Sequence, residues 1–168
     1  MRMGARSAIL AIQPALFVAD RLTKALIESR VSAWESLEVI PHFFSIVHTQ
    51  NRGAAFSLLA DSDGPMRAFL LIGFAALVSV LVAWMLAQSL RAGSTQTQML
   101  RIGLALVLGG AAGNLFDRVA KGSVTDFLLF YIGPYQWPAF NLADSAISVG
   151  AGLILLDMWR TRHVQART

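Results

Sequence analysis

Residues 68–90 read AFLLIGFAALVSVLVAWMLAQSL, a run of 23 residues without one charged side chain. Arg67 precedes this run and Arg91 follows it. A transmembrane helix needs roughly 20 consecutive, mainly apolar residues. The run therefore predicts a helix that crosses a membrane from one side to the other.

The composition of the whole chain agrees with a membrane protein. Of the 168 residues, 55% are hydrophobic and only 14% are charged, whereas charged residues make up about 25% of a typical soluble domain. A single domain is expected at this length. The chain has no cysteine, which excludes disulfide bonds, thiolate metal sites and a cysteine nucleophile.

Three further stretches reach spanning length, although each contains charged residues. We expect spans at about 7–27, 97–117 and 138–159, in addition to 68–90. The first has the basic start of a signal peptide, but Asp20 and Arg21 stand where the small residues of a cleavage site would be expected. We interpret it as a retained helix. The predicted fold class is an all-α membrane protein with four transmembrane helices.

The positions of the basic residues predict the orientation of these helices. Seven arginines lie at the two ends of the chain and in the second connection: Arg2, Arg6, Arg91, Arg101, Arg160, Arg162 and Arg167. Because such residues are enriched on the cytoplasmic side, we expect both termini in the cytoplasm. The net charge of +4 then reflects topology and not a nucleic-acid partner.

The first outward connection, residues 28–66, is too long for an idle loop. Residues 37–47 are rich in β-branched and aromatic side chains, and Asn51-Arg52-Gly53 is a turn signal. We expect a small extramembrane β element on the outer, periplasmic side. The apolar residues 54–60 that follow are expected to cover a site there. The second outward connection, 121–137, contains two glycines and a proline, so it is not expected to be helical throughout.

Charged side chains inside the spans cost roughly 2.5–3.5 kcal/mol each on insertion scales, so each one suggests a function. Asp20 and Lys24 lie four residues apart on one helix, a spacing that favours an ion pair. A structural pair and a pair that orients a site are both open readings. Asp157, at the inner end of the last span, is most simply an interfacial charge.

Two aspartates are expected at one depth near the outer face. Asp126 follows the third span, and Asp144 lies one or two turns inside the fourth. Two carboxyls that share a site do not both ionise readily, so one can act as a general acid and the other as a general base that activates water. For the two residues alone, a structural or ion-conducting role is an equal alternative.

Polar side chains around this depth favour a catalytic site. The third span has Asn114, Asp117 and Arg118 on one face, and the fourth has Asn141, Asp144 and Ser148 on one face. Gly109 and Gly113 form a small-xxx-small pair that permits close helix packing. Hydrogen bonds between helices explain one or two asparagines, but not three acids and an arginine. The three histidines lack metal-ligand spacing, so no metal is expected.

Five segments resemble the signature motifs of lipoprotein signal peptidases, also called type II signal peptidases. They are DRLTK at 20–24, NRGAAF at 51–56, GGAAGNLFDR at 109–118, VTDF at 124–127 and FNLADS at 140–145. The match covers nearly the whole chain, in order. Each motif alone is modestly specific, but the set is highly specific.

The resemblance implies an aspartic endopeptidase of the bacterial inner membrane. Such an enzyme cuts a prolipoprotein on the N-terminal side of a cysteine that carries diacylglycerol. The implied catalytic pair is Asp126 and Asp144. The implied site-lining or supporting residues are Asn51, Gly53, Asn114, Arg118, Asn141, Asp20, Lys24 and Asp117. Thr125 stands where many members carry an aliphatic residue, and we expect it to be harmless because its side chain points elsewhere.

The implied partners are the prolipoprotein and membrane lipid, and no metal or cofactor is expected. We expect no nucleic-acid partner, because the basic residues are explained by topology, and we take a monomer as the default. Two other classes remain as alternatives. A small transporter would use the intramembrane acids for a proton or a cation, although they cluster at the outer end and no inverted pair of broken helices is visible. An assembly subunit would dock a partner on the Gly109 and Gly113 face.

Overall fold

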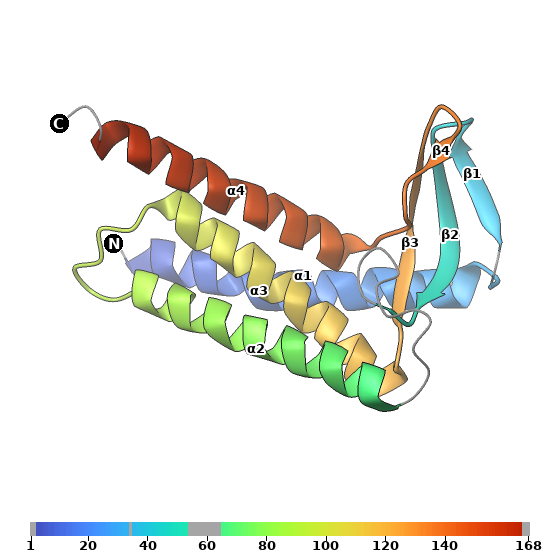
Figure 1. Cartoon of the computed structure of the whole chain (residues 1–168), viewed down its shortest axis with the longest axis horizontal. Helices are drawn as coiled ribbons and strands as arrows, with labels where there is room; N and C mark the ends of the chain where they lie inside the picture. The colour runs from blue at the N-terminus through green and yellow to red at the C-terminus, as the bar shows by residue number, and fades with distance from the viewer. Residues whose placement is uncertain (1–2, 34, 54–64, 166–168) are drawn as a thin grey trace.

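The computed structural model describes residues 3–33, 35–53 and 65–165. These residues form four helices with a small sheet at one end of the helical bundle, and both ends of the chain lie at the opposite end (Figure 1). The helices are α1 (Met3–Arg30), α2 (Pro65–Ser89), α3 (Gln98–Lys121) and α4 (Leu142–Gln165). The expected cover at 54–60 lies outside the described residues.

Within the described residues, three helical segments are long and apolar enough to cross a membrane: Ala68–Ser89, Gln98–Lys121 and Leu142–Arg162. Large apolar side chains of α2 point outward, and Phe69 is 73% exposed, as expected for a helix that faces lipid. Helix α1 has 28 residues, but charged residues at 20, 21 and 24 interrupt its apolar sequence. The structure therefore confirms a mainly helical membrane protein, and the fourth span stays a prediction.

The sheet is antiparallel, with its strands in the order β1-β2-β3-β4. The strands are β1 (Ser36–Ile40), β2 (Phe44–Asn51), β3 (Val124–Ile132) and β4 (Tyr135–Gln136). The first two confirm the expected β element after the first helix. The other two come from the second connection, for which the sequence predicted only a segment that is not helical throughout.

Helix α1 supports both the bundle and the sheet. At the end near the termini, Ile9 belongs to a buried apolar cluster with residues of α2 and α3. At the other end, Ile27 and Val31 pack against Phe127 of β3. This second cluster fixes β3 against the last turns of α1, beside the ends of α3 and α4.

Glycines allow α3 to lie close to two neighbours. A Cβ atom at Gly109 would lie 3.1 Å from the Cα of Gln13, and one at Gly113 would lie 2.6 Å from Oδ2 of Asp20. The predicted small-residue pair is therefore a packing face, and its partner is α1. A second face, which the sequence analysis did not identify, contacts α4: a Cβ at Gly110 would lie 2.4 Å from the carbonyl oxygen of Ala143.

Gly110→Ala is expected to destabilise the protein by about 1–3 kcal/mol, because a backbone oxygen cannot move aside as a flexible side chain can. The matched control is Gly152→Ala on α4, where, apart from the backbone of its own helix and its chain neighbours, no atom of the described residues lies within 4 Å of the added Cβ. Alanine is preferred over glycine in a helix by up to about 1 kcal/mol, so the control should be unchanged or more stable. Thermal unfolding in detergent measures both. Equal melting temperatures for the two variants would contradict the contact.

Candidate active site

Helix α4 begins with a reciprocal cap that holds Asp144 in place. Asn141 precedes the helix, and its Oδ1 accepts a hydrogen bond of 3.0 Å from the backbone N–H of Asp144. In return, Oδ2 of Asp144 accepts one of 3.2 Å from the backbone N–H of Asn141. This is the capping-box arrangement, which satisfies two N–H groups that the helix leaves unpaired. The cap leaves Asp144 with little rotational freedom.

Asp126 reaches the same place from the sheet. Its Oδ1 accepts a hydrogen bond of 2.7 Å from Nδ2 of Asn141, and its Oδ2 accepts one of 3.0 Å from Nδ2 of Asn51. Asn141 therefore bonds both aspartates, one through its amide nitrogen and the other through its amide oxygen. The structure brings Asp126 and Asp144 together from segments 18 residues apart.

Asn114 connects the pair to the interior of the bundle. Its Nδ2 donates a hydrogen bond of 2.7 Å to Oδ1 of Asp144. Its Oδ1 accepts bonds from Nδ2 of Asn141, at 3.3 Å, and from Nζ of Lys24, at 3.0 Å. These three hydrogen bonds of the Asn114 side chain are thus all made with predicted site residues.

Lys24 lies between two acids that, like itself, are fully buried. Its Nζ is 2.8 Å from Oδ2 of Asp20 and 2.7 Å from Oδ2 of Asp117. Asp20 also accepts a bond of 3.1 Å from the N–H of Ala143 in the first turn of α4. The expected Asp20–Lys24 ion pair is thus present, and Asn114 links it to the aspartate pair. The residue that sequence analysis missed is Arg21, which pairs with Asp117 and whose only signal was its place beside Asp20.

Gly53 and Arg118 lie at the rim of the site. The N–H of Gly53 donates to Oδ1 of Asn51 at 2.9 Å, which orients the amide that bonds Asp126. Nη2 of Arg118 lies 3.4 Å from the carbonyl oxygen of Gly53. The guanidinium is close enough to both Asp126 and Asp144 to interact with their charges. It is partly exposed, so it is available to an incoming peptide.

Asp126, which lies in β3 outside the helices, is 3% exposed. Burial raises the pKa of its carboxyl to about 6, and the charge of Asp144 adds to the rise. The hydrogen bonds from Asn51 and Asn141 oppose it. A carboxyl with such a pKa exchanges its proton near neutral pH, as general acid–base chemistry requires.

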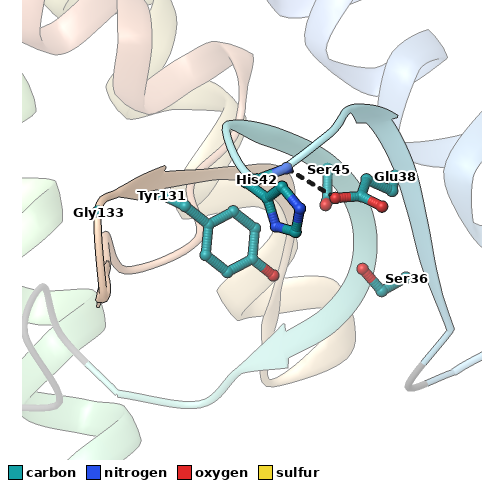
Figure 2. Close-up of a pocket in the computed structure, with 6 residues that line it drawn as sticks. All are labelled: Ser36, Glu38, His42, Ser45, Tyr131 and Gly133. Atoms are coloured by element: carbon teal, nitrogen blue, oxygen red, sulfur yellow. Dashed lines mark hydrogen bonds between the residues drawn. The ribbon is translucent and has the colours of Figure 1, made fainter.

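A separate hollow of about 410 Å³ lies on the sheet (Figure 2). Its lining residues are Ser36, Glu38, His42, Ser45, Tyr131 and Gly133. None of them is a predicted site residue. Tyr131 and Asp126 are five positions apart on β3, so their side chains leave opposite faces of the strand. The hollow therefore does not belong to the carboxylate site.

Comparison with known proteins places the site in context. Residues 12–160 match the family model described as signal peptidase (SPase) II. The lipoprotein signal peptidase of Solibacter usitatus is 45% identical over 151 residues, which cover 90% of each chain. That of Pseudomonas aeruginosa strain PAO1 is 47% identical over 149 residues, 88% of this chain and 85% of the relative.

The fold is also similar to that of a solved bacterial membrane enzyme, with a TM-score of 0.75 and 28% identity. That alignment covers 92% of this chain and 88% of the other. A second bacterial membrane enzyme structure gives a TM-score of 0.72 at 29% identity, with 90% and 92% covered.

Proposed function

The chain belongs to the signal peptidase II family, the lipoprotein signal peptidases, and on this premise we propose that it removes signal peptides from prolipoproteins with Asp126 and Asp144 as catalytic residues. The family indicates a protease and a bacterial membrane protein. The observation that carries the residue assignment is that one residue, Asn141, donates to both carboxyls: its side-chain amide donates to Asp126 and its backbone N–H donates to Asp144. A carboxyl pair held in this way is suited to activating water without a metal or cofactor.

In the proposed reaction Asp126 begins protonated and Asp144 ionised. Asp144 takes a proton from a water molecule whose oxygen attacks the scissile carbonyl carbon, while Asp126 gives its proton to the carbonyl oxygen. The resulting tetrahedral intermediate carries two hydroxyl groups. Asp144 then protonates the leaving nitrogen, the C–N bond breaks, and Asp126 recovers a proton from one hydroxyl. The products are a signal peptide with a new carboxyl end and a lipoprotein with a free amino group.

The surrounding residues have supporting roles in this proposal. Asn51, Asn114 and Asn141 hold the carboxyls, and Arg118 with Gly53 holds the substrate backbone. Asp20, Lys24 and Asp117 keep Asn114 and the first turn of α4 in place. Their contacts support these roles: Lys24 donates to Asn114, which bonds Asp144. Asp20 and Asp117 both pair with Lys24, and Asp20 also accepts from Ala143 in the first turn of α4.

The proposed substrate is cut on the N-terminal side of a cysteine that carries diacylglycerol, and the acyl chains lie in lipid or against apolar helix faces. We infer one monomeric domain in the bacterial inner membrane, with α1 as a fourth span, both termini in the cytoplasm and the sheet outside. The site lies where α3 and α4 meet the sheet, not midway along the bundle. This position disfavours a transporter, whose binding site lies near the midplane.

Cleavage should depend on pH through the proton of Asp126. Because its pKa is raised to about 6, the carboxyl keeps its proton to higher pH than an ordinary aspartate and loses it as pH rises further. We expect kcat/KM for release of the signal peptide to fall as pH rises above about 6, approaching tenfold per unit. Purified protein in detergent with a lipid-modified prolipoprotein provides the assay.

Asn51→Leu gives this prediction an internal check. The hydrogen bond from Asn51 lowers the pKa of Asp126, so its removal should move the falling limb to higher pH as well as lowering the rate. A profile that is flat between pH 5 and 8, or a limb at the same pH in the variant, would exclude Asp126 as the titrating acid. No release of signal peptide at any pH would refute the proposed function itself.

A further inference from the structure

Thr125, the residue before Asp126, joins three elements on the far face of β3. Its side chain is fully buried. Oγ1 of Thr125 donates a hydrogen bond of 2.6 Å to Oε1 of Glu28, in the last turn of α1. The same hydroxyl accepts one of 3.1 Å from Nε2 of Gln50, its register partner on β2. The hydroxyl is thus used both as donor and as acceptor.

Glu28 is itself held in place. Nζ of Lys121, the last residue of α3, lies 2.5 Å and 2.8 Å from its two carboxylate oxygens. Burial alone would raise the pKa of Glu28, but the bonds from Lys121 and Thr125 outweigh it and lower the pKa. The Glu28 carboxylate therefore stays ionised at neutral pH and accepts the hydrogen bond from the Thr125 hydroxyl. Ser123 lies in the short connection between α3 and β3, and its hydroxyl donates a hydrogen bond of 2.8 Å to Oε1 of Gln50. The connection from α3 into β3 is therefore also bonded to β2.

This attachment lies beside an irregularity in the sheet. Between Ile46 and Thr49 the register of β2 shifts, so that Ile46 pairs with Leu128 but Thr49 pairs with Asp126. An advance of two residues on β3 is thus paired with an advance of three residues on β2, as at a β-bulge. A bulge interrupts the ladder and bends the strand, and a slip of one residue would turn every side chain to the other face. The register shift lies directly beside the pair formed by Thr49 and Asp126.

We propose that Thr125 is a positioning residue for the cleavage reaction: its hydroxyl, held by Glu28 and Gln50, fixes β3 so that Asp126 points at Asn51 and Asn141. This inference rests on the proposed catalytic role of Asp126. Since neighbouring side chains on a strand leave opposite faces, Thr125 acts on the reaction without touching the substrate. The expectation that this residue is harmless is replaced by a role specific to the hydroxyl.

Thr125→Val tests the proposal, because valine keeps the shape and removes the hydroxyl. A displacement of about 1 Å in a reacting group can cost up to roughly 100-fold, so we expect kcat to fall about tenfold with KM changed less than twofold. Thr125→Ser, which restores a hydroxyl, should recover most of the loss. Thr161→Val is the matched control, since among the described residues that hydroxyl bonds only the carbonyl of Asp157 in its own helix.

Glu28→Ala removes the partner from the helix side. It should lower kcat by a factor similar to that of Thr125→Val, and the double variant should be no slower than the slower single variant, because both remove one bond. Parental kcat in either single variant, an equal loss in the valine and serine variants, or multiplying losses would overturn the proposal. If Thr125→Val does not accumulate, Glu28→Ala decides, since its side chain is partly exposed.

These outcomes are separate from failure of the proposed function. If the parent protein releases no signal peptide, or Asp126→Asn cleaves normally, the catalytic assignment is wrong. If the parent cleaves and Asp126→Asn does not, a fully active Thr125→Val refutes only the positioning role.

Discussion

Asp126→Asn and Asp144→Asn are each expected to slow prolipoprotein cleavage by about 10²–10⁴-fold, the range that a positioned general acid or base contributes. Asparagine has nearly the shape of aspartate but does not ionise or exchange a proton at neutral pH. Asp144 would lose its role as the acceptor of the water proton. Asp126 would lose the proton that it gives to the carbonyl oxygen.

Both variants should remain folded in the membrane. The oxygen of an asparagine at 144 can still accept the N–H of Asn141, so the cap of α4 is kept. Each variant loses one hydrogen bond that a side-chain amide donates to the aspartate. In Asp144→Asn the lost bond is the one from Asn114. In Asp126→Asn it is the one from Asn51 or the one from Asn141. A hydrogen bond is worth about 1 kcal/mol between neutral groups and about 1.5–3 kcal/mol to a charged group such as ionised Asp144. Each kcal/mol shifts the melting temperature of a chain of this size by about 2–4 °C.

Asp157→Asn is the matched control on the same helix. Asp157 is also buried and accepts a hydrogen bond from Thr97, the cap of α3, so it is more than the interfacial charge that the sequence suggests. Because it lies at the opposite end of α4, its substitution should leave kcat/KM within about twofold of the parent. If the parent is active, full cleavage by Asp126→Asn or by Asp144→Asn would rule out a mechanism that uses the aspartate pair.

Much of the site is predictable from local spacing. Asn114, Asp117 and Arg118 lie on one helical face because of the 3.6-residue period, and the structure directs that face toward Asp144, Lys24 and Gly53. The capping pair Asn141 and Asp144 is likewise three residues apart. Which residues share a helical face follows from their separation along the chain and the helical period, so the sequence alone is enough to predict it.

Contacts between elements are harder to predict. Strand β3 was not predicted, because its pairing with β2 joins residues about 75 positions apart and strand formation depends on such neighbours. The bond from Thr125 to Glu28 crosses 97 positions. For the same reason the sequence did not predict that Gly110 packs against Ala143 of α4, although Gly110 lies within the motif GGAAGNLFDR at 109–118.

Lys24→Met should strongly destabilise the protein. Lys24 is the partner of two buried acids, and removal of one member of a buried ion pair typically costs about 3–5 kcal/mol because a charge is left without compensation. The two acids differ: Asp117 also pairs with Arg21, whereas the carboxyl of Asp20 retains, within the described part of the chain, only the bond from the N–H of Ala143. The destabilisation should therefore arise mainly from Asp20.

A second substitution tests that account. In Lys24→Met/Asp20→Asn the uncompensated charge is gone, and the oxygen of the asparagine can still accept from Ala143. The double variant should thus be more stable than Lys24→Met, while Asp20→Asn alone should be mild because Lys24 keeps Asp117. Lys121→Met is the control: its pair with Glu28 is partly exposed, so it should cost no more than about 1 kcal/mol. Thermal unfolding in detergent compares all four.

The cleavage rate of the double variant separates the two readings of the ion pair. If the pair only stabilises the bundle, restored stability should bring restored cleavage. If Lys24 also orients the site, the double variant stays slow, because Oδ1 of Asn114 has lost the shorter of the two hydrogen bonds that direct its Nδ2 toward Asp144. We expect the second result, with kcat lowered about tenfold in a protein that melts near the parental temperature. Parental kcat in the stable double variant would reduce Lys24 to a structural residue and leave the orientation of the pair to Asn51, Asn114 and Asn141.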